Sequence, residues 1–293
     1  MKDKLLLFDI GGSSIKCGIW EKEELVHLDK VPTPKTWEEM KKVLKGIFDQ
    51  YSDSPYTGVA ISCPGAVDTE KGMINGVSAL PYIHGFPIKQ AFSSLFGVPV
   101  SMQNDANCAG LAELWKGNAQ GASSVCCMII GTGIGGALII DGKLQSGHTL
   151  FGGEFGYQII DRNSLVTLSE AGSPVKMGKN YTKEKADKKV YEGQEVFELA
   201  DNGDKLAKEM VNHLYDALSL AIYNLLVSIN PQKVLIGGVV SKRNDLIYEL
   251  NLRTEKLLKD NGAVELEFEL QTCKFFNDSN LIGAAYQYVL ENQ

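Results

Sequence analysis

The order of apolar and polar positions along the chain predicts a protein in which strands and helices alternate. Apolar runs bounded by glycine indicate strands, and apolar residues spaced three and four apart indicate amphipathic helices. The predicted strands cover residues 5–20 (two strands and a glycine turn), 25–31, 57–62, 98–102, 125–130, 137–140, 234–236 and 265–270. The predicted helices cover 37–51, 88–96, 106–115, 206–228, 245–258 and 281–290, and residues 147–202 are expected to be irregular.

This order of elements occurs twice. A glycine-turned hairpin opens each half, at residues 10–13 and 131–136, and strand–helix units follow each hairpin. The repetition predicts two related α/β domains with a cleft between them, and such clefts are common ligand sites. A length of 293 residues suits two domains of ordinary size.

Composition narrows the class of partner. The chain is 44% hydrophobic and carries a net charge of −7, so it is expected to be globular and to repel nucleic-acid backbones and anionic membranes. It contains neither an apolar run of about 18 residues nor a signal-like start, which favours a cytoplasmic protein. The six cysteines form no C-x-x-C pair and stand mostly in apolar runs, which predicts reduced, buried thiols.

The first hairpin carries the segment Asp9-Ile-Gly-Gly-Ser-Ser-Ile-Lys16. Its glycines allow the backbone to turn tightly and to approach a phosphate, while Asp9 is suited to hold Mg²⁺ directly or through water. Ser13 and neighbouring N–H groups are candidates for binding phosphate oxygens. The alternative is an ordinary hairpin with a surface aspartate. Apolar strands on both sides and the later repeat favour the phosphate interpretation.

The second hairpin, Gly131-Thr-Gly-Ile-Gly-Gly136, matches the pattern G-x-G-x-x-G. An NAD-dependent oxidoreductase would use such a pattern, but its fingerprint requires a helix directly after the glycines. Here an apolar strand, 137–140, and the turn Asp141-Gly142 follow. The segment therefore predicts a second phosphate-binding hairpin, with the oxidoreductase kept as an alternative.

Several polar residues are candidates for substrate contacts. Asp105, between a strand and a helix, is suited to accept a proton from a hydroxyl, and Asn104 to bind neighbouring hydroxyls, although both residue types are also common helix caps. Glu154 and Glu170 are either hydroxyl-binding residues or solvated loop acids. Gly237-Gly238 is either a surface for adenine or ribose or a plain turn. The four histidines show no metal-ligand spacing.

Taken together, these segments resemble motifs of the ROK sugar kinases, which belong to the actin-like, hexokinase-like ATPase superfamily. In order, the motifs are Asp9-x-Gly-Gly-Ser-x-Ile-Lys16, Cys63-Pro-Gly-Ala-Val-Asp68, Asn104-Asp-Ala-Asn107, Gly131-Thr-Gly-Ile-Gly-Gly136 and Gly153-Glu-Phe-Gly156. Asn280-Leu-Ile-Gly-Ala-Ala285 resembles the closing helix of the family. The resemblance implies two actin-like (ribonuclease H-like) α/β domains flanking a cleft. The first covers 1–117, with a helix at 281–293 packing back on it, and the second covers 118–280 with a sugar loop at 147–202.

The resemblance also implies ATP-dependent phosphorylation of a sugar hydroxyl. Asp105 would be the general base, and Asp9 would position Mg²⁺. The implied sugar-binding residues are Gly65, Asn104, Asp105, Glu154, Tyr157 and Glu170. The implied ATP- or phosphate-binding residues are Asp9, Gly11, Gly12, Ser13, Lys16, Gly131, Thr132, Gly133, Gly237 and Gly238.

The chain departs from the family pattern at two places that bear on the substrate. Many relatives carry a histidine at the position of Tyr157, followed by a cysteine-rich zinc motif, whereas the segment from Tyr157 to Glu170 contains no cysteine. No zinc is therefore expected, and a missing zinc-bound histidine would leave room for an aglycone. The segment 78–86 resembles the family's β-glucoside kinases, which implies phosphorylation of the 6-hydroxyl of a sugar such as cellobiose or gentiobiose.

Other functions fit the chain less well. Glucokinase and N-acetylmannosamine kinase are the alternative sugar kinases. The family also includes sugar-responsive regulators with an N-terminal helix-turn-helix domain, but here the hairpin starts at Leu5 and the charge is acidic. The expected partners are a sugar and ATP, with neither nucleic acid nor membrane, and the dimers common in the family predict a homodimer.

Overall fold

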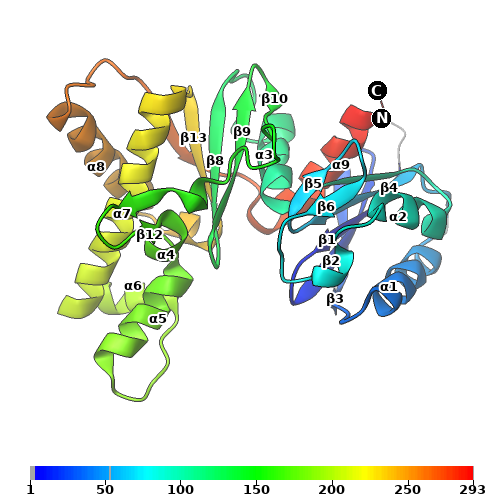
Figure 1. The fold of residues 1–293 in the computed structure, drawn as a ribbon, viewed down its shortest axis with the longest axis horizontal. Helices are drawn as coiled ribbons and strands as arrows, with labels where there is room; N and C mark the ends of the chain where they lie inside the picture. The colour runs from blue at the N-terminus through cyan, green and yellow to red at the C-terminus, as the bar shows by residue number, and fades with distance from the viewer. Residues whose placement is uncertain (1–3, 53, 293) are drawn as a thin grey trace. The chain divides into compact units, whose positions relative to one another are not determined.

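The computed structural model describes residues 4–52 and 54–292, which divide into two compact units (Figure 1). Unit 1 takes the described residues within 1–117, 147–151 and 277–293, and unit 2 takes 118–146 and 152–276. Residues 147–151 and 277–280, which the sequence analysis assigned to the second domain, thus group with unit 1. Each unit contains its own five-stranded mixed sheet.

The sheet of unit 1 has the strand order β3-β2-β1-β4-β7. Neighbouring pairs are antiparallel among the first three strands and parallel from β1 through β4 to β7. The strands are β1 (Leu5–Ile10), β2 (Ser14–Glu21), β3 (Glu24–Pro32), β4 (Gly58–Cys63) and β7 (Val100–Asn104). Every residue of β1 and β4 is buried, as expected for strands covered on both faces.

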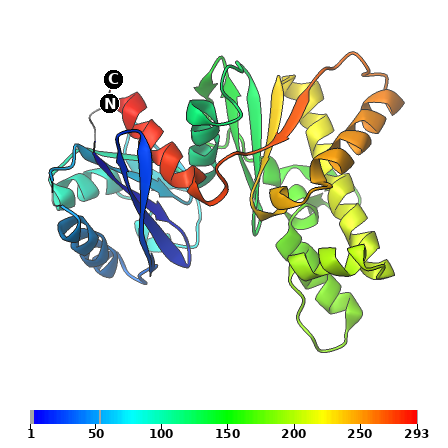
Figure 2. The same ribbon diagram turned by 180° about the vertical axis from the view of Figure 1, so that it is seen from behind.

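Helices cover both faces of this sheet. On one face α1 (Trp37–Gln50) and α2 (Ile88–Phe96) share a hydrophobic core with β1 and β4. On the other, α9 (Ser279–Glu291) packs against α3 (Asp105–Lys116) and against the parallel strands (Figure 2). The two helices approach closely at Gly283, where an added Cβ would lie 1.8 Å from the Cys108 carbonyl oxygen. The C-terminal helix is therefore a structural part of unit 1.

Unit 1 also contains elements that the sequence analysis missed. The short hairpin of β5 (Ala66–Asp68) and β6 (Met73–Asn75) follows β4, and the 3₁₀ helix η1 (Pro81–Ile83) follows it. Strands of three residues carry too few positions for a periodic pattern to show.

The sheet of unit 2 repeats the arrangement with the order β10-β9-β8-β13-β14. Its strands are β8 (Val125–Ile130), β9 (Ile134–Ile140), β10 (Lys143–Leu144), β13 (Lys233–Gly237) and β14 (Glu269–Thr272). The β8–β9–β10 pairs are antiparallel and the β8–β13–β14 pairs parallel, as in unit 1. The predicted α/β class with two related halves is confirmed.

The expectation of an irregular segment at 147–202 is wrong. This segment contains η2 (Phe155–Tyr157), β11 (Ile159–Asp161), β12 (Val166–Thr167), α4 (Leu168–Ala171), α5 (Pro174–Lys185) and α6 (Gly193–Asp201). Glycines concealed the helices, since Gly178 and Gly193 resemble loop residues in the sequence. In the structure they are contact points, because a Cβ would lie 2.7 Å from the Tyr191 carbonyl oxygen and 2.4 Å from that of Pro174, respectively.

Two long helices complete unit 2, α7 (Lys205–Ile229) and α8 (Leu246–Asp260), and the 3₁₀ helix η3 (Val239–Lys242) precedes α8. The strand predicted at 265–270 begins only at Glu269. Among the described residues it has one neighbouring strand, β13, which starts at Lys233, the partner of Glu269. The residues before Glu269 therefore find no strand to pair with in the described part of the chain.

The cysteines behave as predicted. All six are buried free thiols, and burial raises the pKa of Cys17 and Cys126 to about 12, far from a reactive range. Within residues 4–52 and 54–292, no helix combines the length and the apolar character that a membrane span needs.

Candidate functional site

Asp9 lies near the end of β1 and is held by several donors within unit 1. Its side chain is buried, with the residue 6% exposed. Oδ1 accepts hydrogen bonds from Ser62 Oγ at 2.9 Å and from Asn280 Nδ2 at 3.0 Å, while Lys16 Nζ lies 3.3 Å from Oδ2. Ser62 is the register partner of Asp9 on β4, and Lys16 is its partner on β2. The carboxylate is thus fixed by two donors on Oδ1 and by the Lys16 ammonium group beside Oδ2.

The first glycine turn, Gly11 to Ser13, joins β1 to β2. The Gly11 N–H donates to the Ser14 carbonyl oxygen at 3.0 Å. On the other side Thr33, directly after β3, donates its hydroxyl to the Gly11 carbonyl at 2.6 Å and its N–H to the Ser13 carbonyl at 3.1 Å. A Cβ on Gly12 would lie 3.0 Å from the Ala79 Cβ, so the turn packs tightly against the loop that follows β6.

Asp105 occupies the first turn of α3, directly after β7. Its Oδ1 accepts from the Ala106 N–H at 2.9 Å and from Asn104 Nδ2 at 3.0 Å, whereas Oδ2 has no hydrogen-bond partner in the part of the chain that the structure describes. Burial raises the pKa of Asp105, and the negative charge of Asp9 raises it further, against the lowering effect of the bonds to Oδ1. A fixed carboxylate with a raised pKa and one free oxygen is suited to accept a proton.

Asn104 links Asp105 to the loop after β4. Its Oδ1 caps α3 by accepting the Asn107 N–H at 3.1 Å, and its Nδ2 also donates to the Gly65 carbonyl at 3.0 Å. Gly65 has φ +99°, and a Cβ there would lie 2.7 Å from Ile74 Cγ2, so this position requires glycine. The capping and functional interpretations of Asn104 are therefore compatible. Unit 1 brings together all of its predicted residues: Asp9, Gly11, Gly12, Ser13, Lys16, Gly65, Asn104 and Asp105.

The second glycine turn, Gly131 to Gly133, joins β8 to β9 in unit 2 and closes with a Gly131 N–H to Gly133 carbonyl bond of 2.8 Å. Ser173 Oγ lies 2.8 Å from the Gly131 carbonyl oxygen and 3.0 Å from that of Thr132. Ser169 Oγ accepts the Ile134 N–H at 3.0 Å. Because β9 and not a helix follows the turn, the Rossmann interpretation fails and the predicted hairpin is confirmed.

Gly237 and Gly238 lie beside this turn, at the carboxyl end of β13. Gly237 pairs with Ile129 of the neighbouring parallel strand β8. Gly238 has φ +93°, and a Cβ there would lie 1.9 Å from the Ile130 carbonyl oxygen. These glycines allow the backbone after β13 to pass directly against the end of β8. The structure thus brings the two predicted glycine segments of unit 2 together.

The loop 152–157 packs against β9, the strand that follows the same turn. A Cβ on Gly156 would lie 2.0 Å from the Ile134 carbonyl oxygen, and one on Gly153 would lie 2.8 Å from that of Gly136. Backbone therefore packs on backbone, which places η2 and the half-buried Glu154 before it next to β9. Tyr157, at the end of η2, is 67% exposed.

Glu170 does not contact the second glycine turn. In α4 it follows Ser169, about 100° further round the helix, so the two side chains point in different directions. Its side chain is 55% exposed and pairs with Lys176 at 2.5 Å. It lines a cavity of about 330 Å³ together with residues that include Met177 and Met210. Ser169, not Glu170, is the residue of α4 that contacts the glycine turn.

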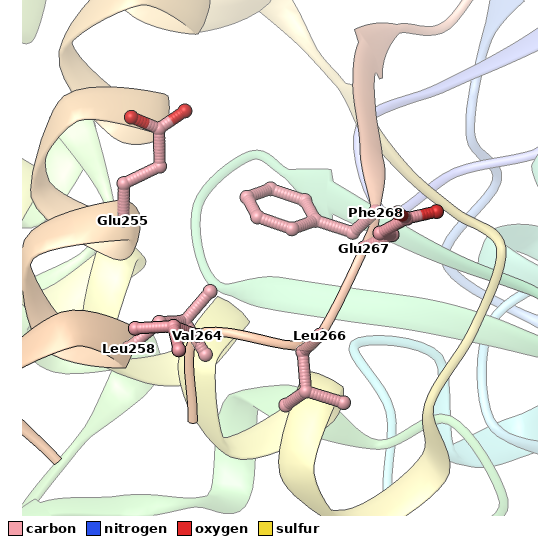
Figure 3. A pocket seen from close by; sticks show the side chains of 6 residues that line it. All are labelled: Glu255, Leu258, Val264, Leu266, Glu267 and Phe268. Atoms are coloured by element: carbon pink, nitrogen blue, oxygen red, sulfur yellow. The ribbon is translucent and has the colours of Figure 1, made fainter. Parts of the chain in front are cut away.

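A second cavity of unit 2, of about 320 Å³, is formed by α8 and the segment before β14. Phe268 extends from that segment toward α8, above Leu258, Val264 and Leu266 (Figure 3). Its other lining residues are Glu255 and Glu267, so none of the predicted site residues belongs to it. Among the described residues, no group of three or more His, Cys, Asp or Glu side chains is arranged to hold a metal ion.

Two mixed sheets with one strand order, each with a glycine turn at the end of its central strand, define a hexokinase-like α/β protein. The model of the ROK family matches residues 6–289, and the chain belongs to the ROK family. It is 30% identical, over 98% of both chains, to the beta-glucoside kinase of Listeria monocytogenes.

Two solved structures agree with this assignment. A ROK family protein from Streptococcus pneumoniae, in complex with sucrose, matches 99% of both chains with a TM-score of 0.90 and 32% identity. A ROK family glucokinase from Streptomyces griseus, in complex with glucose and AMPPNP, matches 96% of this chain and 98% of that one, with a TM-score of 0.80 and 25% identity. The resemblance drawn from the motifs is confirmed at the level of the family.

Sequence reasoning missed the residues that support the predicted ones. Ser62 and Asn280 hold Asp9, Thr33 holds the first glycine turn, and Ser169 and Ser173 hold the second. Of these residues, only Asn280 belongs to one of the family motifs, and that motif predicts a helix and not a site residue. Small polar residues of this kind have no local pattern that separates them from ordinary caps and turns.

Proposed function

We propose that this protein transfers the terminal phosphoryl group of ATP to the 6-hydroxyl of a sugar, and that the sugar is a β-glucoside. The observation that carries the reaction type is Asp105, a fixed and half-buried carboxylate with a raised pKa and a free Oδ2. Membership of the ROK family and the identity to a beta-glucoside kinase support the reaction and the substrate class.

In unit 1, Asp105 would accept the proton of the attacking hydroxyl through Oδ2, which makes that oxygen a better nucleophile. Asn104 and the loop at Gly65 would orient neighbouring hydroxyls. Mg²⁺, when bound, would neutralise charge on the phosphates. Asp9 fits such an ion through water, because two donors already occupy Oδ1 and Lys16 lies beside Oδ2.

In unit 2, the N–H groups of the turn Gly131 to Gly133 would bind phosphate oxygens. The flat backbone at Gly237 and Gly238 would carry the nucleoside. Glu154 and Tyr157 would contact the sugar. Phosphoryl transfer needs positioning and charge neutralisation and no covalent intermediate, so glycine turns and a single base are a sufficient set of groups.

The sugar is the finer part of the proposal. Exposure of Tyr157 supports an open site for an aglycone beyond the first ring. The resemblance of the segment 78–86 to the β-glucoside kinases of the family supports the same substrate class. Glucose is the second candidate, favoured by the glucokinase of Streptomyces griseus that matches the chain.

Initial-rate assays of ADP release test the proposal, with glucose, N-acetylmannosamine, cellobiose and gentiobiose at equal concentrations and with Mg-ATP. The expected result is the highest kcat/KM for cellobiose or gentiobiose. Turnover of glucose alone would replace the β-glucoside by glucose, and no turnover of any sugar would refute the kinase. The Asp105→Asn variant serves as the control for contaminating kinases.

A further inference from the structure

In both glycine turns a hydroxyl group donates a hydrogen bond to the carbonyl of the first glycine, although the turns lie in different units. In unit 1 the carbonyl of Gly11 accepts a hydroxyl bond from Thr33 at 2.6 Å. In unit 2 the carbonyl of Gly131, the corresponding first glycine, accepts one from Ser173 at 2.8 Å. Thr33 follows a strand and Ser173 precedes a helix, so the shared feature is the bond to the turn and not the surrounding element.

These bonds fix the direction of the neighbouring N–H groups. In a trans peptide the carbonyl of one residue and the N–H of the next point in opposite directions, and every peptide bond between described residues is trans. With the Gly131 and Thr132 carbonyls directed at Ser173, the N–H groups of Thr132 and Gly133 point away from it. Neither N–H has a hydrogen-bond partner within residues 4–52 and 54–292.

The same reasoning applies to the first turn. The Gly11 carbonyl is directed at Thr33, so the N–H of Gly12 points to the other side and is likewise without a partner in the described chain. Gly12, Gly131 and Thr132 are exposed. Unpaired N–H groups presented together by a glycine turn form an anion-binding concavity.

Ser173 departs from the usual behaviour of a serine at its position. It is the N-cap residue of α5, where a serine side chain normally accepts an N–H of the first helical turn. Here the cap bond is absent, and the fully buried hydroxyl instead shares its proton between the two carbonyls of the turn. A local rule broken in favour of another contact is typical of a functional position.

We propose that Ser173 and Thr33 are positioning residues for phosphate binding. Each hydroxyl presets the glycine turn of its own unit, so that the N–H of Gly12 in unit 1 and those of Thr132 and Gly133 in unit 2 are oriented to bind phosphate oxygens of a nucleotide. This inference rests on the proposed kinase function and deepens it. Neither hydroxyl touches the nucleotide, and both act through the backbone that does.

The test uses Ser173→Ala and Thr33→Val, which remove the hydroxyls with little change of shape. The chain supplies matched controls in Ser219→Ala and Thr254→Val. Ser219 and Thr254 are fully buried in unit 2, and their hydroxyls have no partner among the described residues. A general effect of deleting a buried hydroxyl appears in the controls, whereas an effect on the turns appears only in Ser173→Ala and Thr33→Val.

The Kd of Mg-AMPPNP is measured by calorimetry for the wild type and the four variants, with the KM for ATP and for sugar and with kcat. Each turn variant is expected to weaken AMPPNP binding about tenfold, the size of one weakened charge-assisted hydrogen bond. The KM for ATP rises accordingly, the KM for sugar stays within about twofold, and the controls keep the wild-type Kd. An unchanged Kd in both turn variants overturns the inference.

A second measurement needs no variant and covers the case in which Ser173→Ala does not fold. In amide NMR spectra of the wild type, the Gly12, Thr132 and Gly133 signals are expected to shift on addition of Mg-AMPPNP, and unshifted signals overturn the inference. If the wild type binds AMPPNP but phosphorylates no sugar, the proposed kinase function is refuted. The Kd values of the variants then still test whether Ser173 and Thr33 position the turns. A wild type that binds no AMPPNP removes both.

Discussion

Replacing Asp105 by Asn separates catalysis from structure at this site. The asparagine Oδ1 can keep both bonds that the aspartate Oδ1 accepts, from the Ala106 N–H and from Asn104 Nδ2. What changes is the free Oδ2, which becomes an NH₂ group that cannot accept a proton. The fold of the strand β7 to helix α3 junction is therefore expected to be retained, and the chemical step to be lost.

The magnitude follows from the role of the lost group. Removal of a positioned general base lowers kcat by a factor of about 10² to 10⁴, or about 3–5 kcal/mol of transition-state free energy. The KM for sugar changes little, because the polar contacts of the remaining side chain are preserved. Nucleotide binding is expected to be unchanged, since the phosphate turns lie at other positions of the chain.

The raised pKa of Asp105 adds a test on stability. Burial and the charge of Asp9 disfavour the ionised form of Asp105 in the folded state. The carboxylate of Asp105 therefore binds a proton more readily in the folded protein than in the unfolded chain. The resulting loss of folding stability is fully present at a pH above the raised pKa of Asp105 in the folded state. It disappears as the pH falls from there to the ordinary pKa of an unfolded aspartate. Asp105→Asn is therefore expected to melt above the wild type at neutral pH, with a difference that shrinks on acidification.

Two assays check these statements together. Coupled ADP release gives kcat, and its acid limb in the wild type is expected above the usual range of an aspartate, because Asp105 must be ionised to act. Thermal unfolding of both proteins across the acid range gives the difference in Tm. A kcat near that of the wild type would remove Asp105 from the mechanism. A Tm difference that does not depend on pH would refute the account of its pKa.

Three further predictions concern the supports of the site and its metals. Gly238→Ala is expected to lower the Tm sharply, because its Cβ would lie 1.9 Å from a carbonyl oxygen. The control Gly203→Ala has a similar φ of +96° but open space around it, so it costs only the backbone strain of about 1 kcal/mol. Equal losses of Tm in the two variants would contradict this explanation. Asn280→Ala removes one of two donors to Asp9 Oδ1 and is expected to raise the Mg²⁺ concentration needed for half-maximal rate, as measured by Mg²⁺ titration at saturating ATP and sugar; an unchanged titration would separate Asp9 from the metal. Elemental analysis of the purified protein is expected to find zinc well below one atom per chain, and Mg²⁺ added after chelation to restore the full rate; stoichiometric zinc would show that the missing cysteine motif was misread.

Much of unit 1 could be predicted because its site residues follow directly from regular elements. The carboxyl ends of parallel strands meet at one edge of a sheet, so a polar residue after each apolar run marks that edge. Asp9 belongs to β1, Gly65 follows β4, and Asp105 follows β7. Strands that are buried on both faces are long apolar runs, which the sequence displays clearly.

Residues of unit 2 beyond the glycine turn could not be predicted in the same way. Whether Ser169 or Glu170 faces the turn depends on the start of α4, a helix of four residues capped by Thr167. So short a helix shows no periodicity in the sequence, and the choice between neighbours comes from its packing against α7 and η2. The bond from Asn280 to Asp9 joins residues 271 positions apart, which no local pattern encodes.

The internal repeat links the fold to the chemistry more closely than any single motif. The two sheets have the same strand order, and in both the turn after the central strand has its first carbonyl bonded by a hydroxyl from outside the hairpin. The donors differ in residue type and in the element that carries them, so the common structural requirement is the orientation of the peptide and not a particular side chain. A turn that binds phosphate through N–H groups must hold those groups in place before the ligand arrives, since otherwise binding would have to order the backbone first. Under the proposed function the two hydroxyls would meet that requirement in the folded chain, and this role would account for a serine at a helix start that does not cap the helix.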